Sequence, residues 1–378
     1  MRALLGLAFL LIAGLAQAQT CPTPAQLVTD LGAATQAQLI ALSGVNPLVC
    51  PEVGMSHTWT GGVLIFSDSP ETVTQKGKLY EDTTLSYTSG TVYNRVHVHH
   101  VNGYSGKTKM KFAILLKNTG TASGELKVQQ KGTAGPSNNY LYAGKLTFYR
   151  WLTSTAGSPV QVAAGQTVRL VTDIETVASP TYLMTGLYDY SFTQNHAITV
   201  CALNETDDPV SVCPTLAVLP RDTHQRGTFP NADKVYDTAQ GVWIDSTQGV
   251  MQLPLAANTV NDPNAQGVDK TDGTAQNLAG NYGVLYRMHL NIKAPDSKKI
   301  GFLMNPRGGT WGGAANTMPG IFTGGKFLIP PDTGYSGDNT KGAVSAKYDP
   351  GTGGLSIWMQ WMPTSASNLP LRFIAAPY

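Results

Sequence analysis

The sequence predicts an all-β protein with two tandem, related antiparallel β-sandwich domains after a short helical N-terminal segment. Only 13% of the residues are charged, while glycine, threonine, serine, asparagine and proline are abundant, which is typical of exported β-proteins with many tight turns. Runs of β-branched and aromatic residues alternate with turns that carry glycine or asparagine, at a spacing typical of sandwiches. The chain has 378 residues, enough for two domains that each bury a core.

Residues 1–18 have the pattern of a secretory signal peptide. Arg2 supplies a positive charge, residues 4–15 form an apolar run, and Ala16 and Ala18 mark a small-residue cleavage site. The apolar run is too short to span a membrane, and no other segment approaches that length. We therefore expect an exported protein in the cell envelope, at the cell surface or in the periplasm, without a transmembrane segment.

Four cysteines in an exported chain suggest two disulfides. Three connectivities are possible. Proximity in the sequence favours Cys21–Cys50 and Cys201–Cys213, because each of these pairs closes a short loop. Metal binding or catalysis by cysteine is not expected in that compartment.

The predicted elements follow in chain order. Residues 24–43 carry alanine, glutamine and leucine at near-helical spacing, with Thr23 as the cap, so residues 19–53 form a helical segment clipped by the first disulfide. The two sandwich domains are expected at residues 54–210 and 211–378, joined near 207–214. Strands of the first domain are predicted at residues 63–66, 91–101, 110–117, 125–130, 145–152, 167–174 and 197–203.

The second half of the chain repeats the motif order of the first half, which indicates an internal duplication. His97 matches His289, and His57 less firmly matches His224, whereas Asn291 stands opposite His99. The first domain therefore carries an additional feature around His99. The matched segments are residues 95–99 with 287–291, 112–118 with 300–305, 143–145 with 324–326, 188–189 with 348–349, and 196–203 with 355–361.

His97 and His99 form the strongest candidate site. Successive side chains of a strand point to opposite faces, so these two imidazoles project on the same side. Two imidazoles on one face can hold a single metal ion, and imidazole suits copper, zinc and nickel. The alternative is a polar strand face without a metal. One or two further ligands would come from His100, His57, His196 or His224.

The His-Val-His run at 97–99, followed by Asn102 and Gly103, resembles the copper-ligand strand of the copper–zinc and copper-only superoxide dismutases. The family's histidine-rich zinc loop is absent, so the resemblance implies copper without zinc. A copper ion held by His97 and His99 would cycle between Cu(II) and Cu(I), oxidising one superoxide and reducing the next. Arg95 or Arg226 would attract the anion.

Five further segments together resemble secreted bacterial β-sandwich proteins often labelled copper-amine-oxidase-like, some of which are attached to the cell envelope or the surface layer. That label implies no particular reaction. The tyrosine-derived quinone site of true copper amine oxidases is not recognisable, because Gly283 departs from the expected sequence context after Tyr282. The segments are residues 66–71, 99–103, 219–222, 224–229 and 280–287.

These observations lead to two functional hypotheses. The first is an exported envelope or surface-layer component that docks onto partner proteins through sheet faces or edges, with a histidine copper site. The second is a copper-only superoxide dismutase. A net charge of +2 gives no reason to expect binding to nucleic acid or to an anionic membrane. No Gly-x-Ser-x-Gly elbow supports serine hydrolysis.

Overall fold

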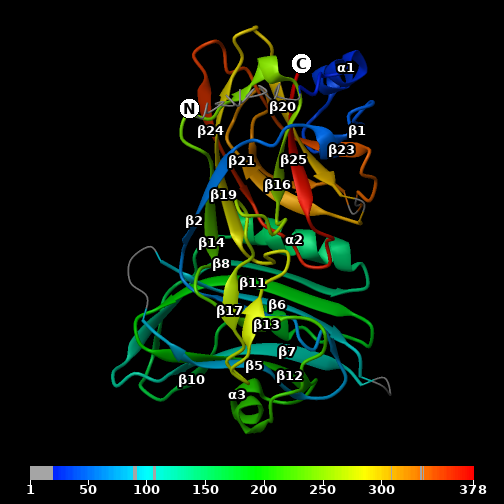
Figure 1. Cartoon of the computed structure of the whole chain (residues 1–378). Coiled ribbons are helices and arrows are strands. Elements are labelled where there is room, and N and C mark those ends of the chain that lie inside the picture. The colour runs from blue at the N-terminus through cyan, green and yellow to red at the C-terminus, as the bar shows by residue number, and fades with distance from the viewer. Residues whose placement is uncertain (1–19, 88–91, 105–107, 308, 333, 335) are drawn as a thin grey trace, which may run out of the picture.

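The computed structural model describes residues 20–87, 92–104, 108–307, 309–332, 334 and 336–378, and the expected signal peptide lies outside them. The described residues form 25 strands and three α-helices, so the all-β fold class is confirmed. The strands build two pairs of sheets, one above the other in Figure 1, which are named here the upper and the lower sandwich. No helix of the described part is long and apolar enough to cross a membrane.

The lower sandwich packs a four-stranded sheet against a larger mixed sheet. Its core contains Ile65, Val96, Phe112, Tyr190 and Ile198, which come from both sheets. The first sheet has the order β10 (Thr167–Arg169), β7 (Met110–Asn118), β12 (His196–Asn204), β5 (Gly77–Leu85). The second has the order β18 (Ala275–Asn277), β17 (Gln266–Val268), β13 (Arg226–Phe229), β3 (Leu64–Ser67), β6 (Asn94–Asn102), β11 (Leu183–Phe192), β8 (Gly124–Ser137), β9 (Val160–Val162), with β4 (Thr72–Val73) beside β6.

The upper sandwich is built in the same way. Its core contains Leu253, Met288, Phe302, Met359 and Phe373. One sheet has the order β1 (Leu39–Ala41), β23 (Lys341–Tyr348), β20 (Ile300–Pro306), β25 (Leu371–Pro377), β16 (Met251–Leu255). The other has the order β2 (Met55–Thr60), β14 (Asp233–Thr238), β19 (Leu285–Lys293), β24 (Leu355–Trp361), β21 (Gly313–Thr317), β22 (Gly325–Ile329), with β15 (Ile244–Asp245) beside β19.

The two sandwiches share one strand order and one set of strand directions, as a duplication predicts. The order β13-β3-β6-β11-β8-β9 matches β2-β14-β19-β24-β21-β22, and β10-β7-β12-β5 matches β23-β20-β25-β16. Both contain a parallel pair at the same place, β3 with β6 and β14 with β19. One sheet of each sandwich is therefore mixed, so the expectation of antiparallel sandwiches holds for the other sheet of each pair but not for this one.

The structure corrects part of the predicted internal alignment. The matches of β6 with β19 and of β7 with β20 agree with the sheet positions, but residues 196–203 lie in β12, whose equivalent is β25. Likewise residues 188–189 belong to β11, whose equivalent is β24. The alignment slips by one strand after the helix α2 (Tyr140–Thr153), because no helix stands between β21 and β22.

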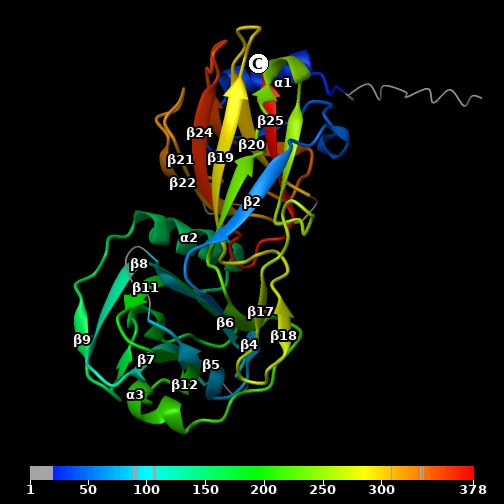
Figure 2. The same cartoon turned by 60° about the vertical axis from the view of Figure 1, so that its left-hand side comes forward.

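Residues 145–152, predicted as a strand, belong to this helix. The side chain of Asn139 accepts a hydrogen bond from the backbone N–H of Tyr142 and so caps the first turn. Phe148, Trp151 and Leu152 follow at helical spacing and are buried together with Leu285 and Met362 of the upper sandwich. Figures 1 and 2 show α2 lying where the two sandwiches meet. Contacts made across that junction therefore override the strand-like local sequence.

Each sandwich receives a strand from the half of the chain that builds the other sandwich. The strand β2, early in the chain, pairs with β14 in the upper sandwich, and the chain then enters the lower sandwich at β3. In the second half β13 pairs with β3 in the lower sandwich, and the chain then enters the upper sandwich at β14. Figure 2 shows β2 rising along the upper sandwich. The expected boundary between residues 210 and 211 therefore does not separate the sheets.

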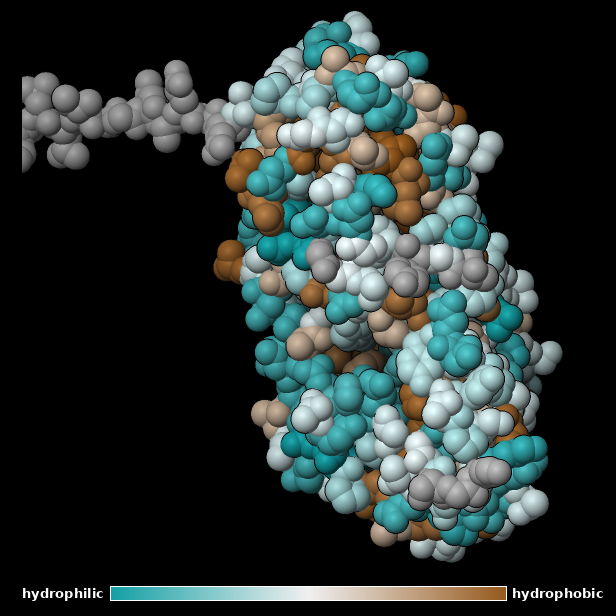
Figure 3. All heavy atoms as spheres, turned by 90° about the vertical axis from the view of Figure 1, so that its right-hand side faces the viewer, coloured by the Kyte–Doolittle hydropathy of each residue, from teal (hydrophilic) through white to brown (hydrophobic). Residues whose placement is uncertain are grey.

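The N-terminal segment and the short helices complete the fold. Both expected disulfides, Cys21–Cys50 and Cys201–Cys213, are present. The helix predicted for residues 24–43 is shorter, because α1 (Ala25–Ala33) ends before β1 joins the upper sandwich. The remaining helical elements are α3 (Pro209–Val212) and the 3-10 turns η1 (Pro47–Val49), η2 (Asp173–Glu175), η3 (Cys213–Thr215) and η4 (Ser246–Gln248). Figure 3 shows one face of the molecule hollowed near the level where the sandwiches meet.

Candidate functional site

The strand β6, which carries the histidine run, is buried along its whole length. Val96 and Val98 point into the core of the lower sandwich. Because side chains alternate along a strand, Arg95, His97 and His99 share the opposite face, which loops of the upper sandwich cover. The prediction that His97 and His99 lie on one face agrees with this geometry. That face is a junction between two layers of protein and not a solvent surface.

Arg95 is a structural anchor of this junction. Its Nε and Nη2 donate to the two carboxylate oxygens of Asp189 at 2.7 and 2.8 Å. Its Nη1 donates to the carbonyl oxygens of Ala232 and Gly283, and lies 3.1 Å from Oδ1 of Asp233. The side chain is only 1% exposed, so its charge is enclosed and neutralised. This arrangement does not support the predicted role of Arg95 in attracting an anion.

Arg226 is enclosed in the same manner. Its Nε donates to Asp269 at 2.8 Å, and Nη1 donates to the carbonyl oxygens of Ser69, Leu79 and Leu219. Nη2 donates to the hydroxyl of Thr271. With a side chain that is 3% exposed, Arg226 ties the loops around β13 together instead of facing a substrate. Its predicted role in attracting superoxide therefore has no support in the geometry.

His97 is enclosed by groups that hydrogen-bond to its ring or pack against it. Its Nε2 hydrogen-bonds the hydroxyl of Ser365 at 2.7 Å, and its ring packs edge-on against Phe66. A Cβ atom added to Gly283 would lie 2.8 Å from Nδ1, so the backbone of the upper sandwich covers that nitrogen. Burial, with the nearby charge of Arg95, lowers the pKa of His97 to about 3. His97 is thus a neutral packing residue.

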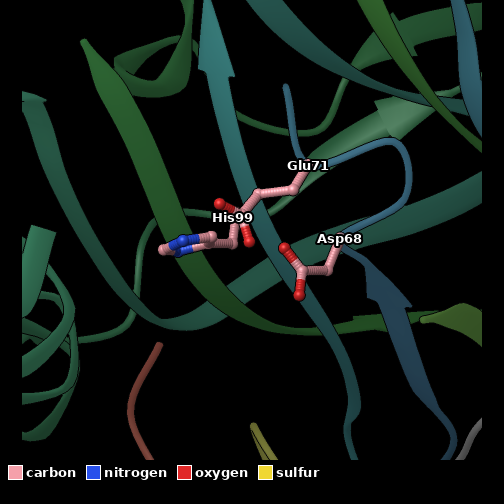
Figure 4. Close-up of side chains that lie close together, drawn as sticks. All are labelled: Asp68, Glu71 and His99. Atoms are coloured by element: carbon pink, nitrogen blue, oxygen red, sulfur yellow. The ribbon is translucent and has the colours of Figure 1, made fainter. Parts of the chain in front are cut away.

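His99 has a different environment, although it lies two residues further along the same face. The Nδ1 atoms of both histidines are buried without a hydrogen-bond partner among the described residues, but only His99 lies beside carboxylates. A nitrogen of its ring and carboxylate oxygens of Asp68 and Glu71 all lie within 4.8 Å of one another. Figure 4 shows the two carboxyl groups facing each other beside the imidazole. Both acids come from the segment that links β3 to β4.

The electrostatics of this cluster favour a bound cation. Burial, together with the charges of Glu71 and Asp222, raises the pKa of Asp68 well above its ordinary value. The Oδ1 atom of Asp68 is buried without a hydrogen-bond partner in the described structure. Burial, together with the neighbouring histidines, keeps the pKa of His99 well below its ordinary value, so the imidazole is neutral and can act as a ligand. A cation between these groups would relieve the repulsion among the carboxylates.

His224 stands at the edge of the same cluster. Its Nε2 lies 2.9 Å from Oε2 of Glu71, and its Nδ1 lies 3.1 Å from Oδ2 of Asp222. The side chain is 43% exposed, so it can turn without disturbing the core. The structure therefore brings together two of the histidines proposed from the sequence, His99 and His224.

The other candidate histidines lie elsewhere. His100 points to the opposite face of β6, where its ring nitrogens hydrogen-bond the hydroxyl of Ser67 and the carbonyl oxygen of Pro70. His196 is buried against the hydroxyl of Tyr190 at 2.9 Å. His57 lies on β2 of the upper sandwich, beside Trp59. His100 does not belong to this cluster, because strand alternation sends its side chain away from His99.

A pocket of about 250 Å³ opens beside the cluster. The lower sandwich supplies Asp68, Glu71 and His99, whereas the upper sandwich supplies Tyr282 and the loop at residues 365–368. The hydroxyl of Tyr282 donates to the carbonyl oxygen of Ser367 at 2.6 Å, which fixes the far wall. The arrangement can hold a metal ion and leave space for a water molecule or a small ligand next to it.

Asp68 and Glu71 were not expected as ligands from the sequence. The sequence does contain one indication of the site, because both acids lie in one of the five segments that resemble envelope proteins. These segments are residues 66–71, 99–103, 219–222, 224–229 and 280–287. The structure gathers residues from each of these segments around one place. A spacing rule could not find the cluster, because its members are far apart in the chain.

Comparisons with known proteins give no family for this chain. No protein-family model and no curated protein matches it. Among solved structures, a CUB1-EGF-CUB2 fragment of human MASP-1/3 aligns over 79% of this chain and 98% of its own, with 8% identity and a TM-score of 0.19. The coconut allergen cocosin aligns over 81% and 86%, with 9% identity and a TM-score of 0.12. Scores this low carry no argument about fold or function.

Proposed function

We propose that this protein is an exported envelope or cell-surface protein that binds one divalent transition-metal ion in the pocket of Asp68, Glu71 and His99. The observation that carries the proposal is the convergence of a neutral imidazole and two carboxylates, within 4.8 Å, around buried atoms that have no hydrogen-bond partner in the described part of the chain. Two disulfides fit the proposed location outside the cytoplasm.

The protein's own groups would share the work of holding the ion. His99 supplies a nitrogen from a rigid central strand, while Asp68 and Glu71 supply oxygens from the adjoining loop. His224 is placed to become a further ligand or to hold Glu71 in position. The bound ion would supply a Lewis-acid or redox centre next to the open part of the pocket.

The donor set bears on the choice of metal. The His-Val-His run predicts copper, but only its second histidine lines the pocket. Imidazole suits zinc, copper and iron, whereas carboxylates suit harder ions such as manganese. Copper is therefore one candidate in a set that also includes zinc, iron(II) and manganese. We propose superoxide dismutation only for the protein with bound copper, so this activity is assayed once the bound metal has been identified.

The proposal is tested by metal titration of the full-length mature protein. Protein freed of metal by a chelator is titrated separately with Cu²⁺, Zn²⁺ and Mn²⁺ in a calorimeter, and metal content is checked by mass spectrometry. We expect one ion per chain for the preferred metal. His99→Asn and Asp68→Asn should each weaken binding by at least about tenfold, since few ligands share the ion.

The matched control is His289→Asn, the same substitution on the equivalent strand of the upper sandwich. His289 is exposed and hydrogen-bonds Asp237 at 2.8 Å, far from the cluster in the fold. This variant should keep wild-type metal content. Undiminished metal binding by folded His99→Asn and Asp68→Asn proteins would place the site elsewhere and refute the proposal.

A further inference from the structure

A second pocket, of about 430 Å³, lies in the upper sandwich and shares no residue with the metal pocket. Its walls come from the turn η1, the end of β20, the residues before β23 and the strand β25. The polar side chains that line it are those of Asn46, Asn305, Arg307, Asn339, Thr340 and Arg372. Two of these carry a positive charge, and none of the lining residues is acidic.

Arg372 is the decisive group. The residue is only 6% exposed, and its Nε is buried without a hydrogen-bond partner in the described structure. A buried polar group without a partner costs stability unless something else satisfies it. The other buried arginines show the usual solution, since Arg95 pairs with Asp189 and Arg226 pairs with Asp269. Arg372 has no such carboxylate among the described residues.

Arg307 adds a second guanidinium to the same space. Burial, together with repulsion from Arg307, lowers the pKa of Arg372 to about 10, while Glu52 acts in the opposite direction. Two arginines that repel each other across a pocket form a site of positive potential. An anion between them would remove the repulsion and give the buried Nε of Arg372 a partner.

The pocket wall is held in place by its own hydrogen bonds. The side-chain amide of Asn305 donates to the carbonyl oxygens of Asn339 and Lys341, both at 2.8 Å. Asn46 accepts from the backbone N–H of Leu48 and so fixes the η1 turn. Arg372 itself projects from β25, which is hydrogen-bonded on both sides, to β16 and β20. The pocket therefore does not depend on a ligand to form.

We infer that this pocket binds a small molecule through an oxyanion, either a carboxylate or a phosphate group, held between Arg372 and Arg307. A guanidinium presents N–H groups in a fork that matches the oxygens of both groups. The volume of about 430 Å³ is in the range of small-molecule sites, so the anionic group can belong to a larger molecule such as an acidic sugar.

The inference is tested with inorganic phosphate and with acetate on the full-length mature protein. Thermal unfolding is followed in concentration series of each salt, with sodium chloride added to keep the ionic strength constant. We expect one of the two series to raise the melting temperature above the value in chloride alone. A response to phosphate alone identifies a phosphoryl group, and a response to acetate alone identifies a carboxylate.

Three variants decide whether the response comes from this pocket. Arg372→Gln should raise the anion concentration that gives half the effect by about tenfold or more, because a charge-assisted bond is lost. Arg307→Gln should weaken binding severalfold. Because Arg307 is exposed, this variant should fold, and it tests the pocket even if Arg372→Gln does not fold. Arg150→Gln removes the same charge from the exposed surface of α2 and should behave as wild type.

Two outcomes would overturn the inference. In the first, neither phosphate nor acetate stabilises the protein beyond chloride. In the second, Arg307→Gln and Arg150→Gln respond alike, which would mean that the stabilisation is a general salt effect. Neither outcome bears on the metal pocket, which is tested by other residues and other ligands.

Discussion

The strands β6 and β19 occupy the same place in two sandwiches of the same strand order, yet they carry different chemistry. All nine residues of β6 are buried, whereas β19 alternates between buried and more exposed positions. His97 on β6 is 3% exposed, while the side chain of His289, its sequence counterpart on β19, is 56% exposed. The difference arises because loops of the upper sandwich cover the outer face of β6. A histidine thus acquires its properties from what packs on its sheet and not from its place in a repeated motif.

The two matched arginines extend this comparison. Arg95 and Arg287 come from equivalent strands and both approach Asp233, through its Oδ1 and Oδ2 respectively. Arg95 is enclosed, but the side chain of Arg287 is 41% exposed. Two residues from equivalent strands therefore contact the two oxygens of one carboxylate at the junction. Because Arg95 is buried and Arg287 is partly exposed, we expect their substitution to change the free energy of unfolding by different amounts, although the two residues match in the sequence.

The largest effect is expected from Arg95→Met. This change leaves Asp189 buried without its main partner and removes one of the two arginines beside Asp233, which keeps Arg287. Breaking a buried pair typically costs about 3–5 kcal/mol. Arg287→Met also removes a contact with Asp233, but at a half-exposed position, and should cost under about 1 kcal/mol. Both values are measured by urea unfolding. Equal losses would show that the burial of β6 is not what distinguishes the two strands.

A smaller effect is expected where the upper sandwich covers His97. Gly283 has a φ angle of +81°, and a Cβ there would lie 2.8 Å from the His97 ring. Gly283→Ala should therefore lower the free energy of unfolding by about 1–3 kcal/mol. Gly353→Ala, in a turn of the upper sandwich where no atom lies within 4 Å of the added carbon, should be close to neutral. If the two alanine variants unfold at the same urea concentration, this loop does not press on β6.

The last test uses pH. Burial lowers the pKa of His97 from 6.5 to about 3, so the unfolded chain binds a proton that the folded protein excludes. Stability is then fully present above about pH 6.5 and falls by up to about 1.4 kcal/mol per pH unit as the pH drops towards 3. His97→Gln should make the unfolding free energy less dependent on pH between 6.5 and 4. An unchanged slope in this variant would mean that His97 is not buried as a neutral ring.

Several features of this protein follow from local spacing in the sequence. Alternation along a strand placed His97 and His99 on one face, and short loop lengths selected Cys21–Cys50 and Cys201–Cys213. The repeated motifs around His97 and His289 identified a real equivalence of β6 with β19. Each of these inferences uses residues that are close in the chain, or the same short pattern met twice.

Which histidine can bind a ligand depends on contacts between distant parts of the chain. His97 is closed off by Ser365 and Gly283, which lie far away in the sequence, whereas His99 meets Asp68 and Glu71 across neighbouring segments. The sequence also could not predict that β2 pairs with β14 and β13 with β3, because the pattern of residues along a strand does not indicate which sheet the strand joins. Local sequence fixes the direction of a side chain from its strand, but the layer packed against that strand determines what the side chain contacts.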